Sequence, residues 1–136
     1  QMPARFYVFA SFVAASSLLG LADPASAGDG KICGKNEGGY VAEYKVDFTD
    51  DKGVTTSTGY NQGTAFGAKK CYKASDAYGN NVIPKNLRFT MSVTAQGGTG
   101  AGKYDTCTPS NQLYSATGST ITYKSSGTTT NVTCQK

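Results

Sequence analysis

Strict alternation of apolar and polar residues in two long segments constrains the fold of this chain more than any other feature. In segment 40–48, one face carries Tyr40, Ala42, Tyr44, Val46 and Phe48, and the other carries Glu43, Lys45 and Asp47. In segment 86–95, the alternate apolar positions are Leu87, Phe89, Met91, Val93 and Ala95. A period of two places every second side chain on the same face of a β-strand. Both segments are therefore predicted to be strands with one buried face.

Shorter segments repeat this pattern between turn sequences. Further strands are predicted at 54–60, 70–73, 103–108, 120–124 and 128–135, with residues 125–127 (Ser-Ser-Gly) as the last turn and 76–81 as a loop. No stretch after residue 28 shows the 3.6-residue apolar period of a helix. We expect an all-β domain, a small antiparallel β-sandwich (immunoglobulin-like or jelly-roll-like) of six to eight strands, with a small barrel as the alternative.

The first 27 residues resemble a secretion signal. Arg5 supplies the positive charge, segment 6–21 is apolar, and Ala25 and Ala27 are the small residues that precede a cleavage site. An uncleaved membrane anchor is less favoured, because the apolar run is interrupted by serines and falls short of the roughly 20 residues that a span needs. We therefore predict a signal peptide at 1–27 and a single secreted domain at 28–136, acting outside the producing cell.

Four cysteines lie in the predicted domain, and export gives them an oxidising environment. An even number in a small exported chain favours two disulfides. Three pairings are open, and we favour Cys33–Cys71 with Cys107–Cys134, because each would tie an irregular or terminal segment to a strand. A zinc site is disfavoured because no pair has CxxC spacing and the chain has no histidine.

The absence of histidine also removes the common hydrolytic mechanisms, which activate a serine or cysteine through an imidazole. A pair of carboxylates could still hydrolyse glycosides, with Glu37, Glu43, Asp47, Asp50, Asp51, Asp76 and Asp105 as candidates. Glu43 and Asp47 share the polar face of one strand, where solvent would leave their acidity ordinary. We therefore expect a protein that is not an enzyme, with no cofactor and no metal, and keep a carboxylate-dependent hydrolase as the last alternative.

Two loops imitate binding motifs. Residues 97–103 match GxxxxGK, but Tyr104 follows where Ser or Thr would hold magnesium, and we interpret the segment as a flexible connection. Asp47, Asp50 and Asp51 could offer oxygens to calcium, yet they lack the ligand spacing of an EF-hand and suit an ordinary turn.

Asn131 heads the sequon Asn-Val-Thr and is a candidate for glycosylation.

Tyrosine is the abundant aromatic residue, and four tyrosines fall in predicted loops or at strand ends. These four form the candidate binding surface: Tyr60, Tyr78, Tyr104 and Tyr114. The first hypothesis is a secreted binding protein, effector-like or lectin-like, that recognises an extracellular protein or a glycan. The alternative is a membrane-active or pore-forming toxin, for which the membrane surface is the partner. Nucleic acid is a poor partner for the scattered lysines of a chain with net charge +4.

Overall fold

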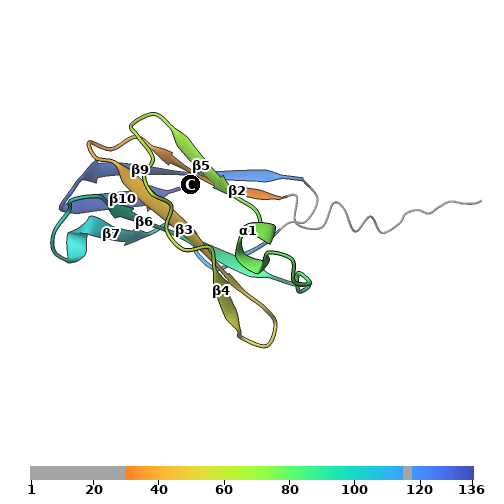
Figure 1. Cartoon of the computed structure of the whole chain (residues 1–136). Coiled ribbons are helices and arrows are strands. Elements are labelled where there is room, and N and C mark those ends of the chain that lie inside the picture. Colours follow the sequence, from red (N-terminus) through yellow and green to blue (C-terminus); the bar gives the residue numbers. More distant parts are fainter. Residues whose placement is uncertain (1–29, 115–117) are drawn as a thin grey trace, which may run out of the picture.

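The computed structural model describes residues 30–114 and 118–136, which form a two-layered β structure (Figure 1). Two sheets face each other and no closed barrel forms, so the prediction of an all-β sandwich is confirmed. The described residues contain nine strands, of which three are only two or three residues long. The predicted signal peptide lies outside the described residues.

Sheet I has the strand order β10-β9-β2-β5. Its strands are β2 (Lys31–Asn36), β5 (Lys69–Tyr72), β9 (Thr120–Thr128) and β10 (Asn131–Gln135). β9 and β10 form an antiparallel hairpin, and β2 pairs antiparallel with β5. β2 and β9 run parallel, and this is the one parallel strand pair among the described residues.

Sheet II has the order β4-β3-β6-β7, with β8 pairing beside one end of β6. Its strands are β3 (Ala42–Thr49), β4 (Thr55–Ser57), β6 (Arg88–Ala95), β7 (Tyr104–Thr106) and β8 (Gln112–Leu113). The two long strands β3 and β6 pair antiparallel along their whole length. The β3–β4 hairpin projects past the rest of the sandwich (Figure 1).

The core lies between the inward faces of β3 and β6 and the facing side of sheet I. The apolar residues at the alternate positions of the two segments are all buried, with Ala42, Tyr44, Val46 and Phe48 at 0% exposure, whereas Val41 on the opposite face is 40% exposed. The alternation therefore predicted the inward face of sheet II correctly. Sheet I contributes fewer large side chains, chiefly Ile32, Tyr72 and Tyr123.

A polar contact joins the two sheets at the centre of this core. The Tyr44 hydroxyl and the Ser125 hydroxyl lie 2.5 Å apart, and both residues are 0% exposed. The Tyr44 ring covers Gly34, where an added Cβ would come within 2.5 Å of ring carbons. Sheet I thus offers a small residue and a hydroxyl to fit one large tyrosine from sheet II.

Two disulfides connect segments of the sandwich. Cys33–Cys71 links directly paired positions of β2 and β5 within sheet I. Cys107–Cys134 joins the residue after β7, in sheet II, to β10 in sheet I. These are the pairs that the sequence analysis favoured, and the second bridge closes one edge of the sandwich.

The structure corrects three details of the sequence interpretation. Segment 31–36, which is not among the predicted strands, is strand β2. Residues 75–78, expected in a loop, form the short helix α1 (Ser75–Tyr78), because the Asp76 carboxylate accepts a hydrogen bond from Lys73 N at 2.7 Å and closes its first turn. The last turn lies at residues 129–130, since the expected turn 125–127 belongs to β9, where Ser125 is buried.

Candidate functional site

The structure separates the four candidate tyrosines into two pairs. Tyr78 and Tyr114 pack against the core at the end of the sandwich that carries α1. Tyr60 and Tyr104 lie on the outer face of sheet II, and they are 39% and 51% exposed. The predicted surface is therefore not one continuous patch.

Tyr78 and Tyr114 both contact Phe48 from the side. The Tyr114 ring meets Phe48 edge to face at 5.3 Å between centroids, and the Tyr78 ring lies at 6.3 Å. The Tyr114 hydroxyl donates to the Gly30 carbonyl at 2.6 Å and accepts from Ala74 N at 3.2 Å. Contacts of this kind hold chain segments together, so this pair serves the fold.

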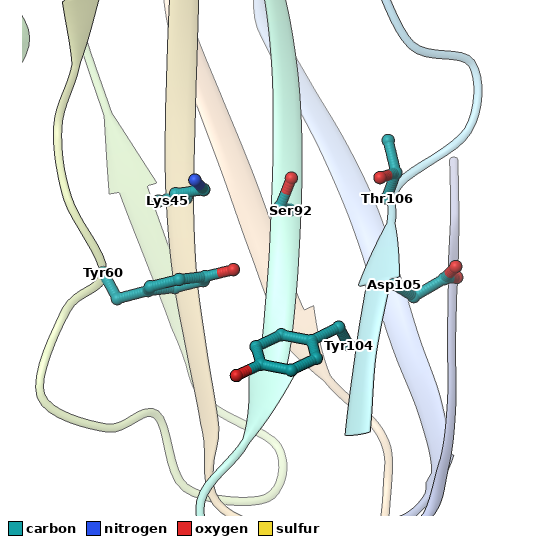
Figure 2. Close-up of a pocket in the computed structure, with 6 residues that line it drawn as sticks. All are labelled: Lys45, Tyr60, Ser92, Tyr104, Asp105 and Thr106. Carbon is teal, nitrogen blue, oxygen red and sulfur yellow. The ribbon is translucent and has the colours of Figure 1, made fainter. Parts of the chain in front are cut away.

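Tyr60 and Tyr104 line an open groove of about 350 Å³ across sheet II. Figure 2 shows the two rings directed toward each other from opposite sides, across the strands that carry Lys45 and Ser92. The other lining residues are Lys45, Ser92, Asp105 and Thr106. We call this site the tyrosine groove.

Strand register builds the floor of the tyrosine groove. Lys45 on β3 is paired with Ser92 on β6, and Ser92 is paired with Thr106 on β7. Their side chains therefore stand in one row on the outer face, about 4.8 Å apart from strand to strand. An ammonium group and two hydroxyls in a row offer hydrogen bonds to a polar ligand lying across the sheet.

The segment that carries Tyr60 is fixed to β3 at both sides of the residue. Thr58 N donates to the Val46 carbonyl, and Asn61 N donates to the Tyr44 carbonyl, each at 3.0 Å. The Asn61 side-chain oxygen in turn accepts from Tyr44 N at 2.7 Å. This bonding continues the ladder beyond β4 and turns Tyr60 outward.

Tyr104 is positioned by the connection to the other sheet. The Asp105 carboxylate accepts a hydrogen bond from Cys134 N at 2.8 Å, so its acidic group points away from the two rings (Figure 2). The Cys107–Cys134 disulfide follows two residues later. Alternation along β7 then leaves Tyr104 and Thr106 on the groove side.

The glycine-rich segment 97–103 packs tightly against the β9–β10 turn just before Tyr104. A Cβ at Gly98 would clash with the Thr129 carbonyl, and a Cβ at Gly102 with the Thr130 carbonyl. The segment ends in the three-residue 3₁₀ turn η2 (Ala101–Lys103), and β7 follows it. Its glycines therefore permit close backbone approach, in a connection that is more tightly packed than the flexible one we expected.

Charge at the tyrosine groove is shared between lysines and carboxylates. Lys45 Nζ lies 3.5 Å from Asp47 Oδ2 and 5.2 Å from the centre of the Tyr60 ring. Burial raises the pKa of the Tyr60 phenol above its ordinary value, and the nearby Tyr104, Asp47 and Glu43 act in the same direction. The Tyr60 hydroxyl is consequently protonated at neutral pH and can both donate and accept hydrogen bonds.

Several other acidic residues make local contacts. Glu43 Oε2 accepts from Gln96 Nε2 at 2.8 Å, and Glu37 pairs with Lys35 at 3.7 Å. Asp50 Oδ1 accepts from the backbone N–H groups of Lys52 and Val54 and closes the β3–β4 turn. Within residues 30–114 and 118–136, no group of three His, Cys, Asp or Glu residues is arranged to hold a metal ion.

Comparisons with known proteins give partial structural likeness only. No protein-family model matches the sequence, and no curated protein matches it. Three solved structures each overlap with 77% of the chain. Pneumolysin is 16% identical, with a TM-score of 0.42, and listeriolysin O is 17% identical, with a TM-score of 0.45. A disulfide-locked mutant of intermedilysin with human CD59 is 13% identical, with a TM-score of 0.45. The chain spans about a fifth of the length of these proteins. An overlap of this extent describes partial backbone similarity and carries no function.

Sequence reasoning found the two groove tyrosines but missed the residues between them. Lys45, Ser92 and Thr106 were not singled out, although alternation already placed Lys45 and Ser92 on outward faces. The missing information was the register, which sets Lys45 beside Ser92 and Ser92 beside Thr106. Asn131, the candidate for glycosylation, is exposed at the start of β10.

Proposed function

We propose that this chain is a secreted, non-enzymatic binding protein that recognises an extracellular carbohydrate through the tyrosine groove. The observation that carries the proposal is the meeting of Tyr60 and Tyr104 across the row formed by Lys45, Ser92 and Thr106. The two disulfides support an oxidising, extracellular environment.

The groove suits a sugar because it combines apolar ring surface with closely spaced polar groups. A sugar ring presents C–H groups on its faces and hydroxyls around its rim. The exposed tyrosine rings can contact the faces, and the ammonium and hydroxyl groups of the floor can bond the rim. The open, shallow form of the site favours part of a longer glycan over an enclosed small molecule.

The absence of enzymatic activity is part of the proposal. Of the acidic residues near the groove, Asp105 is bonded to Cys134 N, Asp47 is paired with Lys45, and Glu43 accepts from Gln96. Acid catalysis by a carboxyl group needs a protonated side chain beside the substrate. All three carboxylates are engaged by other groups of the protein, so the groove is suited to binding and not to hydrolysis.

A glycan array tests the proposal directly. The full sequence is expressed with export to an oxidising compartment, and the N-terminus of the purified protein is sequenced, with Gly28 expected as its first residue. The protein should bind a subset of glycans, and Tyr60→Ala with Tyr104→Ala should abolish that binding. Phe66→Ala is the matched control, since Phe66 is 74% exposed but does not line the groove. Unchanged binding by the double variant would remove the groove as the site.

A second candidate function is attachment to a membrane surface, and exposed apolar side chains favour it. Val54, Val82 and Leu113 are 56%, 90% and 59% exposed. Strand register brings Val54 and Leu113 to the same end of sheet II, because Thr49 pairs with both Thr55 and Arg88 and Arg88 pairs with Leu113. Among the described residues, no helix is long and apolar enough to cross a bilayer.

Liposome flotation distinguishes this second function from the first. The protein should float with lipid vesicles and lose that ability in the Val54→Ser, Leu113→Ser double variant. The Tyr60→Ala, Tyr104→Ala variant should float as the parent protein does. Absence of flotation at high protein concentration would exclude the membrane function and leave the carbohydrate proposal in place.

A further inference from the structure

A lysine lies over each of the two rings of the tyrosine groove. Lys45 Nζ is 5.2 Å from the centre of the Tyr60 ring, and Lys103 Nζ is 4.9 Å from the centre of the Tyr104 ring. Cation–π attraction favours this placement of an ammonium group within about 6 Å of a ring. The groove is thus flanked on both sides by a positive charge resting on an aromatic surface.

Three carboxylates lie near the groove, and none of them forms a salt bridge with Lys103. Glu43 accepts a hydrogen bond from Gln96 Nε2. Asp105 directs its carboxylate toward Cys134 N, on the side away from the rings (Figure 2). Asp47 pairs with Lys45, while in residues 30–114 and 118–136 no salt bridge joins Lys103 to an acidic group. Lys45 keeps further N–H donors, because an ammonium group has three and the carboxylate of Asp47 is its one ionic partner there.

The positions of the two lysines relative to the groove floor add a geometric argument. Lys45 begins the row that continues through Ser92 and Thr106, and Lys103 immediately precedes Tyr104 at the other side. A ligand that lies along this row places its hydroxyls over Ser92 and Thr106. Acidic substituents at its edges would then meet an ammonium group at either side.

We infer that the carbohydrate bound by the tyrosine groove is an acidic one, whose carboxylate or sulfate groups are held by Lys45 and Lys103 while its rings lie against Tyr60 and Tyr104. This inference rests on the proposed carbohydrate-binding function and adds the chemical class of the ligand. Lysine binds carboxylate and sulfate alike as a point charge, so the shared chemistry is an anionic sugar.

Matched pairs of polysaccharides test the inference and separate the two sources of charge. One pair is polygalacturonate and its carboxyl-reduced, neutral derivative. The other is a sulfated galactan and its desulfated form. The parent protein should bind at least one acidic member about tenfold more tightly than its neutral counterpart, and that preference should shrink as salt is raised from 20 to 500 mM, because salt screens exposed charges.

The outcomes distinguish this inference from the function on which it rests. Equal binding of the acidic and neutral members, through the groove tyrosines, would overturn the inference and keep the carbohydrate function. Binding of no carbohydrate, acidic or neutral, in these assays and on the array would overturn both.

Variants assign the preference to the two lysines. Lys103→Gln should weaken binding of the acidic polysaccharide about fivefold and leave any binding of the neutral one unchanged. Lys45→Gln should weaken binding of the acidic polysaccharide more than binding of the neutral one, because the Lys45 ammonium group also donates hydrogen bonds from the groove floor. Lys45→Arg should restore most of the affinity, because it keeps the charge and the partner for Asp47. Lys124→Gln, an exposed position on sheet I, is the control and should bind as the parent does. Equal losses for acidic and neutral ligands would contradict a role for the lysine charge.

Discussion

The two tyrosine pairs of this protein have the same chemistry and different surroundings. Tyr78 and Tyr114 contact Phe48 at the end of the core, and the Tyr114 hydroxyl joins two separate backbone segments. Tyr60 and Tyr104 contact lysines on the outer face of sheet II and line an open groove. A tyrosine in a loop is therefore not informative by itself; what its ring faces decides whether it stabilises the fold or forms a surface.

The largest expected effects on stability come from removal of the two disulfides, and only one of these removals should also affect binding at the tyrosine groove. Removing Cys107–Cys134 by double alanine substitution should lower the free energy of unfolding by about 3–4 kcal/mol, and removing Cys33–Cys71 should cost about as much, because the closed segments span 27 and 38 residues. Only the first variant should also weaken groove binding, since that bridge follows Tyr104 in β7. Urea denaturation gives the stabilities, and titration calorimetry with a bound glycan gives the affinities.

Equal losses of affinity in the two disulfide variants would contradict the assignment of Tyr104 to a site anchored by β10. Retention of affinity in both variants would mean that the Asp105 hydrogen bond to Cys134 N and the pairing with β6 position β7 without the bridge.

Tyr114→Ala and Tyr104→Ala should affect opposite properties. Tyr114→Ala removes an edge-to-face contact with Phe48 and two hydrogen bonds, and it should lower the free energy of unfolding by about 2–3 kcal/mol. Tyr104→Ala removes a half-exposed ring and should change stability by less than about 1 kcal/mol. Thermal denaturation and glycan binding, measured on the same samples, check both. Loss of binding in folded Tyr114→Ala would break the distinction between the pairs.

Gly102→Ala should disturb the groove indirectly. The added methyl group would overlap the Thr130 carbonyl, so the segment before Tyr104 must shift, at a cost of about 1–2 kcal/mol. Affinity for the glycan should fall because Lys103 and Tyr104 move with the segment. Gly39→Ala is the control, since the nearest atom to its Cβ would lie 3.8 Å away. Unchanged affinity in Gly102→Ala would show that Tyr104 is held independently of this segment.

The smallest expected effect is the contribution of the fully buried Tyr44 to the pH dependence of stability. Burial raises the pKa of Tyr44 to about 12, while its hydrogen bond with Ser125 acts in the opposite direction. An unfolded tyrosine ionises near pH 10. Between these values the unfolded chain holds fewer protons than the folded one, so stability is fully present below pH 10 and falls as pH rises toward 12.

Comparison with Tyr44→Phe isolates this contribution. The variant lacks the hydrogen bond to Ser125, so its free energy of unfolding at neutral pH should be about 1 kcal/mol lower. Its stability should also decline less steeply above pH 10. The measurement is the free energy of unfolding in urea at a series of pH values from 8 to 12. Parallel curves for the two proteins would mean that Tyr44 does not contribute to the alkaline decline.

Sheet II could be predicted from the sequence and sheet I only in part, and the cause is the size of the inward residues. β3 and β6 alternate large apolar and polar side chains, so their strands and faces were identified correctly. The inward positions of β2 include Gly34 and Asn36, which are typical of turns. The core requires both residues, because the Tyr44 ring covers Gly34 and the Asn36 amide donates to the Tyr40 and Thr64 carbonyls.

A small polar residue at an inward position also explains why the last turn was predicted at the wrong place. Ser125 is buried against the Tyr44 hydroxyl, but in the sequence it begins a Ser-Ser-Gly segment that favours a turn. For the groove, composition and position predicted Tyr60 and Tyr104 as exposed rings. The division of the four tyrosines depends on long-range packing around Phe48, which no local pattern contains.

The parallel pairing of β2 with β9 has a consequence for how the molecule reaches its native state. These strands lie about ninety residues apart in the chain, and β2 is the inner neighbour on which both β9 and β5 pair. A high contact order of this kind slows folding, because a large loop must close before the pairing contributes stability. As synthesis proceeds from the N-terminus, sheet I cannot be completed until β9 has been made. The emerging polypeptide therefore keeps sheet I incomplete, with the inner strand β2 lacking its parallel partner, until residues 120–128 have been synthesised.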